Sequence, residues 1–127
     1  MSLTVKSKKV DGVVVIEMNG RITSGEPQLL LRSTVRRFID DGNNRFVLNL
    51  TGVSHIDTTG LGELVSAKSV LIQQGGEINL VGLTKRVKDL LVMTHLALEF
   101  GLFDQESEAV AALQGDRKVE RVPTGQN

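Results

Sequence analysis

The sequence predicts an α/β domain in which helices pack on a mixed, largely parallel central sheet. Three observations predict this class. A tight hairpin signal, Asp11-Gly12, separates two short strand-like runs near the start. An almost continuous apolar run, Phe46–Leu50, is typical of a strand that is covered on both faces. Strand-like and helix-like segments then alternate, so the predicted order is β-β-α-β-α-β-α-β-α, with four helices.

Two antiparallel strands are predicted at the start of the chain. Residues 3–10 alternate loosely between apolar and polar side chains, and their polarity suits a strand at the edge of the sheet. The second strand, residues 13–18, is rich in β-branched side chains and is predicted to end at Asn19-Gly20. A loop then leads to Pro27, which suits the first turn of a helix.

The helix that begins at Pro27 is predicted to continue to Asp41, with Gly42 as its end. Arginines and an aspartate occupy one side, which we expect to be solvated. The other side is apolar at helical spacing. The apolar residues are Leu31, Val35, Phe38 and Ile39.

The central strand is predicted over residues 45–50, and a second helix is predicted to run from the segment Asp57–Gly62 to about Gln74. Residues 51–55 are expected to connect the two. The apolar arc of this helix is wide, so we expect it to be the most buried helix of the domain. The residues of this arc are Leu61, Leu64, Val65, Ala67, Val70, Leu71 and Ile72.

The alternation continues to the end of the domain. The pattern predicts a strand over residues 77–83, a helix capped by Thr84, a short strand near residues 100–103 and a final helix over residues 105–113. Residues 1–114 thus form the predicted domain. Residues 115–127 are polar, and we expect them to form a disordered tail.

Composition and charge restrict the classes of function. The 15 Lys and Arg residues balance the 15 Asp and Glu residues, so we expect no nucleic-acid or acidic-membrane partner. No cysteine is present, which excludes disulfides, thiolate metal sites and cysteine nucleophiles. No apolar run approaches the ~20 residues of a membrane span. We therefore expect a cytoplasmic protein without membrane insertion.

The residues do not predict an enzyme. The two histidines, His55 and His95, have no metal-ligand spacing, and neither of the phosphate-binding glycine motifs is present. We expect His55 to have a packing role. No metal site and no cofactor is predicted.

The segment Asp57–Gly62 contains the candidate site. It lies where the central strand ends and a helix begins, which is the edge of a parallel sheet where ligands bind. Asp57 can cap the helix start. An aspartate after a buried strand could also accept a phosphoryl group, as in receiver domains. That chemistry requires Mg²⁺ held by further carboxylates, and the loop after the second strand has no acid to supply one.

The other chemical possibility in this segment is a hydroxyl that a kinase modifies. Thr58 lies at a helix N-terminus, where negative charge is tolerated. A phosphoryl group there would add roughly −1.5 to −2 charges. Gly60 and Gly62 each cost a helix about 1 kcal/mol relative to alanine, so they indicate either close packing or docking. From the residues alone, a helix cap and a docking surface both remain open.

The segment Asp57–Gly62 resembles the Asp-Ser-Ser/Thr-Gly-Leu-Gly signature of anti-sigma factor antagonists, the STAS domain family. The turn Gly20–Thr23, the strand Gly75–Val81 and the acidic closing helix at residues 104–113 are also similar to the pattern of that family. The similarity covers about residues 3–114. The resemblance implies the STAS fold.

The resemblance also implies a partner-switching function. In this family the unphosphorylated antagonist binds an anti-sigma factor that is also a Ser/Thr kinase, and a sigma factor is released. Phosphorylation of the hydroxyl after the aspartate weakens binding, and a phosphatase reverses it. Carried over by position, the phosphorylated residue is Thr58, where most members have serine. The implied partner-binding residues are Thr23, Asp57, Thr58, Thr59, Gly60 and Leu61.

A second function remains open within this resemblance. A STAS domain can serve as an accessory or assembly domain, as in stressosome-like or lipid-transport complexes, where the same surface binds without a switch. Met93 and Leu96, late in the third predicted helix, are expected in the core. The alternative is that they widen an apolar docking patch, because methionine adapts to different partners.

Overall fold

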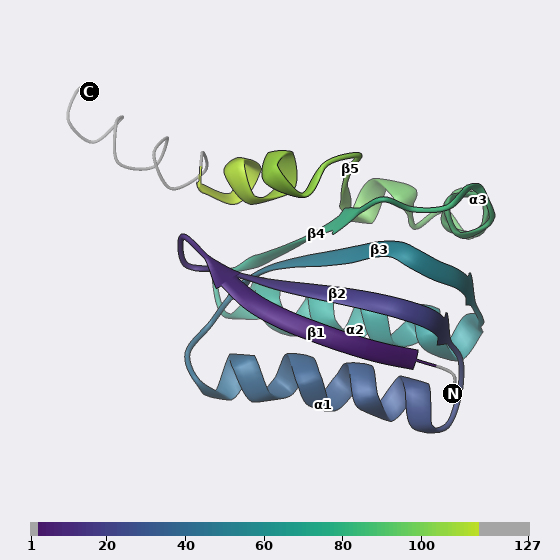
Figure 1. The fold of residues 1–127 in the computed structure, drawn as a ribbon, viewed down its shortest axis with the longest axis horizontal. Coiled ribbons are helices and arrows are strands. Elements are labelled where there is room, and N and C mark those ends of the chain that lie inside the picture. Colours follow the sequence, from purple (N-terminus) through teal and green to yellow (C-terminus); the bar gives the residue numbers. More distant parts are fainter. Residues whose placement is uncertain (1–2, 115–127) are drawn as a thin grey trace.

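The computed structural model describes residues 3–114 (Figure 1). Over this range the chain forms five strands, four α-helices and one short 3-10 helix. The elements are β1 (Leu3–Val10), β2 (Val13–Ile22), α1 (Glu26–Asp40), β3 (Arg45–Ile56), α2 (Thr58–Gln73), β4 (Glu77–Val81), α3 (Lys85–Met93), the 3-10 helix η1 (Ala97–Glu99), β5 (Gly101–Phe103) and a last helix at residues 106–114. The predicted order is confirmed. The predicted tail, residues 115–127, lies outside the described residues.

The strands form one sheet in the order β1-β2-β3-β4-β5. β1 and β2 are antiparallel and the other three pairs are parallel, so the predicted mixed, largely parallel sheet is confirmed. Asp11 and Gly12 turn the hairpin with φ values of 52° and 84°. This left-handed conformation is what a two-residue Asp-Gly turn requires.

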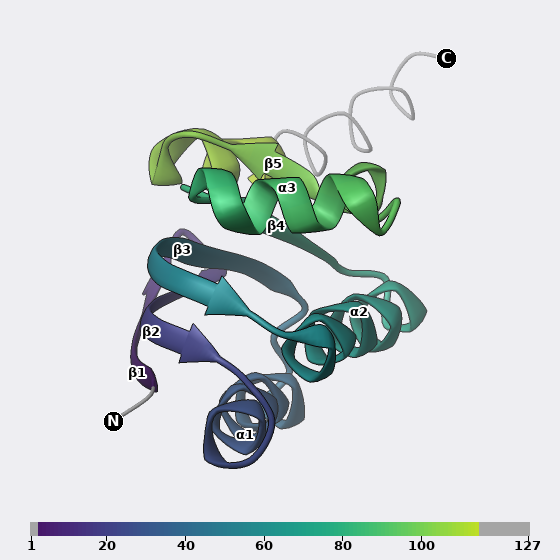
Figure 2. The same ribbon diagram turned by 90° about the vertical axis from the view of Figure 1, so that its right-hand side faces the viewer.

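Helices cover both faces of the sheet. α1 and α2 lie on one face, and α3 and the helix at residues 106–114 lie on the other (Figure 1, Figure 2). Neighbouring residues of β3 point to opposite faces. Phe46 and Leu48 enter the larger apolar core, whereas Val47 packs in a smaller core with Ala109 and Val110. This double coverage explains why the central strand is apolar along its length.

β2 and β3 are both longer than predicted. The predicted stop of β2 at Asn19-Gly20 and the predicted connection at residues 51–55 are wrong, because β2 continues to Ile22 and β3 to Ile56. The two extensions pair with each other, with shifts of register on either side of residues 19–20. Such bulges let a strand pass through residues that interrupt its alternation. The extensions carry the sheet up to the start of α2.

The predicted burial of the apolar residues is wrong at three positions. Leu61 and Leu71 of α2 are buried, but Val65 is 38% and Ile72 is 49% exposed. The sheet covers only one side of the helix, and the apolar arc extends beyond that side. Met93, which was expected in the core, is 75% exposed at the end of α3.

The remaining boundaries differ only slightly from the predicted ones. β4 ends at Val81 rather than at residue 83, because Gly82 has a φ of 71° and turns the chain. The final helix begins at residue 106 and its predicted apolar side is buried against the sheet. That side consists of Ala109, Val110 and Leu113.

Candidate functional site

The segment Asp57–Gly62 lies where the sheet meets α2. Figure 2 views this edge of the molecule, with the arrowheads of β2 and β3 and the start of α2 in front and α3 above them. β2 and β3 end side by side at the register pair Ile22 and Ile56. The loop after β2 and the turn after β3 are therefore neighbours. This is the strand edge at which the sequence predicted the site.

Asp57 is the N-cap of α2 and connects it to the loop after β2. Its Oδ1 accepts a 2.8 Å hydrogen bond from the N–H of Gly60, and its Oδ2 accepts a 3.1 Å bond from the N–H of Ser24. The N–H of Asp57 donates to the carbonyl oxygen of Ile22 at 3.2 Å. The predicted cap is confirmed, and both carboxylate oxygens are engaged by backbone donors.

The surroundings of Asp57 hold its carboxyl group in the ionised form. The hydrogen bond from the Gly60 N–H is the largest cause of a lowered pKa. Partial burial acts in the opposite direction, while the N–H groups of Ser24 and Thr59 and the charge of His55 lower the pKa further. An ionised group at this position interacts favourably with the helix dipole. A negative charge is therefore held directly before Thr58.

Thr58 is the first residue of α2, and its side chain is exposed. The capping hydrogen bond is made by Asp57 and not by Thr58. The Thr58 hydroxyl is thus dispensable for the helix start and accessible from solution. Thr59, the next hydroxyl, is half-buried. Of the two threonines, Thr58 is the better placed to meet an enzyme or a partner.

Gly60 and Gly62 have different structural roles. Gly60 is buried, and a Cβ atom there would overlap the carbonyl oxygen of Ile22. Glycine therefore lets the first turn of α2 lie against the end of β2. Gly62 is exposed, and no atom lies within 4 Å of where its Cβ would be. Close packing explains Gly60, whereas nothing in the packing of residues 3–114 requires Gly62.

The other residues predicted to bind a partner differ in exposure. Thr23 is half-buried at the end of β2, and its carbonyl oxygen accepts a 3.0 Å hydrogen bond from the N–H of Gln28. Leu61 is only 5% exposed and packs in the larger core. The structure thus brings Thr23, Asp57 and Thr58 to one edge of the sheet. Leu61 supports this edge from within.

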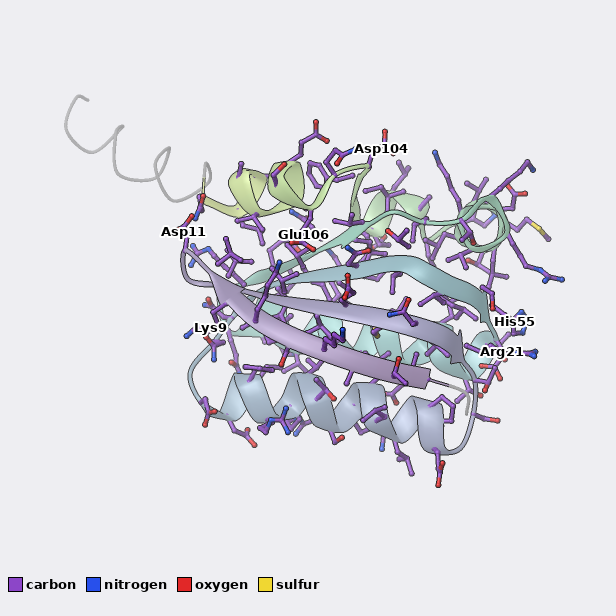
Figure 3. The ribbon with its side chains drawn as sticks, viewed as in Figure 1. Lys9, Asp11, Arg21, His55, Asp104 and Glu106 are labelled. Carbon is purple, nitrogen blue, oxygen red and sulfur yellow. The ribbon has the colours of Figure 1, made fainter. Side chains whose placement is uncertain are left out.

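Arg21 and His55 extend the same edge. Arg21 and His55 are paired across β2 and β3. Figure 3 shows both side chains at the ends of these strands. Arg21 is exposed and His55 is half-buried. Arg21 could not be singled out from the sequence, because its place beside His55 depends on the unexpected extension of both strands.

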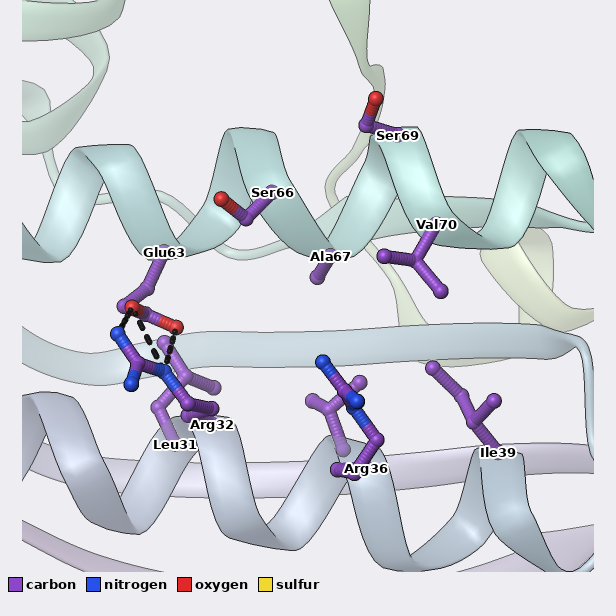
Figure 4. Close-up of a pocket in the computed structure, with 10 residues that line it drawn as sticks. Leu31, Arg32, Arg36, Ile39, Glu63, Ser66, Ala67, Ser69 and Val70 are labelled. Carbon is purple, nitrogen blue, oxygen red and sulfur yellow. Dashed lines mark hydrogen bonds and ion pairs between the residues drawn. The ribbon is translucent and has the colours of Figure 1, made fainter.

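An ion pair between the exposed Arg32 and the buried Glu63 joins α1 to α2 and was not predicted. Glu63 is only 8% exposed, and its Oε2 lies 2.6 Å from Nη2 of Arg32 and 3.2 Å from Nε2 of Gln28. Figure 4 shows the pair at one end of a groove of about 460 Å³ between the two helices. The hydrogen bonds from Arg32 lower the pKa of Glu63, which burial alone would raise. The pair fixes the side of α2 that faces α1.

Within residues 3–114, no three His, Cys, Asp or Glu side chains gather as a metal site would require. Over the same residues, every helix is too short or too polar to cross a bilayer.

Comparison with known proteins places the chain in a family. The model of the STAS domain matches residues 4–109. A Thermotoga neapolitana protein named as an anti-sigma factor antagonist is 30% identical over 108 residues, which are 85% of this chain and 96% of that protein. The anti-sigma F factor antagonist of Paenibacillus polymyxa is 24% identical over 119 residues, 90% of this chain and 97% of its own.

Solved structures agree with these matches. The crystal structure of a Thermotoga maritima protein named as an anti-sigma factor antagonist superposes with a TM-score of 0.81 at 27% identity, covering 87% of this chain and 94% of that chain. The anti-sigma factor antagonist SpoIIAA in its unphosphorylated form shares the fold, with a TM-score of 0.77 at 19% identity over 88% of this chain and 97% of its own. The chain therefore belongs to the STAS domain family.

Proposed function

We propose that this chain is an anti-sigma factor antagonist that acts by binding and not by catalysis. In its unphosphorylated form it binds, in the cytoplasm, an anti-sigma factor that is also a Ser/Thr kinase, and a sigma factor is released. The observation that carries this proposal is the exposed Thr58 hydroxyl directly after the capping carboxylate of Asp57. Membership of the STAS family and the names of the relatives support it.

Phosphorylation of Thr58 by the partner switches the complex off. The phosphoryl group adds roughly −1.5 to −2 charges. Because Asp57 makes the capping hydrogen bond, the modification leaves the helix start intact. It also adds to the negative charge of Asp57, so the change falls on the surface that the partner contacts and not on the fold. SpoIIAA, which shares this fold, has been solved in phosphorylated and unphosphorylated forms.

The residues around Thr58 contribute to recognition in two ways. Thr23, Asp57 and Thr59 contribute polar groups to the surface that the partner reads. Gly60 and Leu61 are buried, so they hold the backbone of this surface in place. A Ser/Thr phosphatase would restore the hydroxyl of Thr58 after the switch. ATP is bound by the kinase, and this chain needs no cofactor for its role.

The partner can be identified by affinity capture with the full chain as bait, followed by mass spectrometry. The captured kinase is then purified and incubated with the chain and ATP. We expect one phosphate per chain, located at Thr58 by tandem mass spectrometry. Capture of permease or stressosome-type subunits, with no kinase, would favour the alternative of an assembly domain without a switch.

Three variants test the switch once the kinase has been identified and purified. Thr58→Glu should lose binding and Thr58→Ala should retain it, as measured by titration calorimetry. Thr4→Glu, which adds the same charge at an exposed threonine of β1, is the matched control and should bind normally. Unchanged affinity in Thr58→Glu, with the fold intact by circular dichroism, would count against a switch at this residue.

A further inference from the structure

The groove between α1 and α2 takes no part in the proposed switch, and its volume is about 460 Å³ (Figure 4). Much of its lining is apolar and comes from both helices. The apolar residues are Leu31, Val35 and Ile39 of α1 and Ala67 and Val70 of α2. The volume lies within the range of small-molecule pockets, roughly 300 to 1,000 Å³. The groove is therefore large enough for a small molecule with an apolar part.

One end of this groove is electrically neutral. Figure 4 shows the ion pair of Arg32 and Glu63 at that end. Both carboxylate oxygens of Glu63 accept hydrogen bonds from Arg32, at 2.6 Å and 3.2 Å, and Gln28 donates to one of them as well. The charges of the pair offset each other, and the carboxylate already has its partners. This end therefore offers little attraction to a further charged group.

Arg36 supplies a second positive charge to the groove. It follows Arg32 by one turn of α1, and Figure 4 shows its side chain directed toward α2, between the ion pair and Ile39. Arg32 is the largest cause of the lowered pKa of Glu63, and the charge of Arg36 adds to it. Within the described part of the chain, no carboxylate lies at ion-pair distance from Arg36. The lining of the groove thus has an excess of one positive charge.

The two sides of Arg36 differ in polarity. Across the groove, α2 offers the exposed hydroxyl side chains of Ser66 and Ser69. A hydroxyl can donate a hydrogen bond to an anionic oxygen. At the end away from the ion pair, Ile39 and Val70 make the groove apolar (Figure 4). A cation beside two hydroxyls is therefore followed along the groove by apolar surface.

We propose that the groove between α1 and α2 binds a small amphiphile with a single negative charge, of the class of medium-chain carboxylic acids. The carboxylate pairs with the guanidinium of Arg36 and accepts a hydrogen bond from a serine hydroxyl of α2. The alkyl chain lies against Ile39 and Val70, where its contact with water is reduced. The site shares no residue with the segment Asp57–Gly62, so it is separate from the proposed switch.

Titration calorimetry of the full chain with decanoate, below its micellar concentration, tests the charge and the chain length of the ligand. Decyltrimethylammonium has the same alkyl chain and a positive head group. We expect decanoate to bind at least about tenfold more tightly, with a difference that shrinks as salt is added. Octanoate should bind more weakly than decanoate, by about twofold for each methylene removed. Equal binding of the two decyl compounds, or no binding of decanoate at millimolar concentration, would overturn the inference.

Matched variants locate the site. Arg36→Gln should weaken the binding of decanoate about tenfold, whereas Arg37→Gln, at an exposed arginine outside the lining, should change it less than about twofold. Val70→Asp should also weaken binding, because it places negative charge beside the alkyl chain. Val65→Asp, on the same helix but outside the lining, should not. Circular dichroism confirms the fold of each variant. Equal losses in Arg36→Gln and Arg37→Gln would contradict the proposed site.

An acidic membrane is the competing partner for the arginines of α1. Cosedimentation of the full chain with phosphatidylglycerol vesicles measures this binding, and we expect none. Binding to the vesicles that Arg36→Gln and Arg37→Gln weaken equally would show that the exposed face of α1 meets lipid, and it would overturn the inference. Thr58→Glu should bind decanoate as the parent chain does, so the ligand site and the proposed switch can fail separately.

Discussion

The carboxylate of Asp57 accepts a 2.8 Å hydrogen bond from the backbone amide of Gly60, and this bond begins α2. Gly60 reaches this position because it has no side chain to overlap the carbonyl oxygen of Ile22. The cap and the glycine thus form one structural unit at the carboxyl edge of the sheet. Thr58 lies inside this unit, yet its hydroxyl takes no part in the capping hydrogen bond.

Replacing Asp57 by alanine should destabilise the domain by about 1 kcal/mol at neutral pH, because a cap and an interaction with the helix dipole are lost. The pKa of Asp57 is lowered in the folded protein. Its stabilising effect is therefore complete above the unfolded value of about 3.9 and disappears as the pH falls through the folded pKa. Urea denaturation at neutral and acidic pH measures both effects.

The variant and the parent protein should converge in stability at low pH. Asp41→Ala, at the exposed end of α1, is the control and should have little effect at neutral pH. A difference between Asp57→Ala and the parent protein that stays constant down to pH values below the folded pKa would contradict the role assigned to the carboxylate.

The two glycines of the first turn should respond in opposite directions to alanine. Gly60→Ala forces a Cβ against the backbone of Ile22 and should destabilise the domain by about 1 to 3 kcal/mol. Gly62→Ala meets open space and should stabilise the helix by up to about 1 kcal/mol. Thermal unfolding of both variants measures the contrast. Loss of stability in Gly62→Ala would show that its backbone has a structural role not evident from its surroundings.

The ion pair between Arg32 and Glu63 should stabilise the contact of α1 with α2. Arg32→Ala leaves the buried carboxylate of Glu63 with Gln28 as its remaining hydrogen-bond partner and should lower the free energy of unfolding. NMR titration should also show a higher pKa for Glu63 in this variant. Arg37→Ala, on the same helix, should change stability by less than about 0.5 kcal/mol. An equal loss of stability in both variants would indicate that Arg32 stabilises α1 as a helix residue and not through its ion pair with Glu63.

Asn49 should matter for the last helix. Its Nδ2 donates a 3.2 Å hydrogen bond to Oε1 of Glu106, and Nζ of Lys8 lies 3.0 Å from Oε2 of the same carboxylate. Together with Lys8, the larger cause, this bond lowers the pKa of Glu106. Asn49→Asp replaces the donor by a second negative charge, so it should raise that pKa and destabilise residues 106–114 by about 1 kcal/mol.

Hydrogen exchange measures the effect of Asn49→Asp directly. The amides of residues 106–114 should exchange faster in the variant, while those of α1 should not change. Adding Glu106→Gln should restore slow exchange, because it removes the repulsion. Persistent fast exchange in the double variant would point to a cause other than charge.

Several features of the fold and of the site followed from the sequence because they depend on neighbours along the chain. The Asp11-Gly12 turn and the cap at Asp57 are of this kind. A turn type, a helix start and a periodic apolar pattern are each set by a few consecutive residues. The order of strands and helices followed for the same reason.

Other features were decided only by tertiary structure. The sequence could not separate Gly60 from Gly62, because the difference lies in the distant carbonyl oxygen of Ile22. It also missed the pairing of Glu63 with Arg32, which depends on how α1 and α2 pack. The exposure of Ile72 was missed too, because an apolar arc does not show which part of it the sheet will cover. The sequence alone thus determined the order of the elements and the capping role of Asp57. Only packing between distant segments decided which residues became core and which became surface.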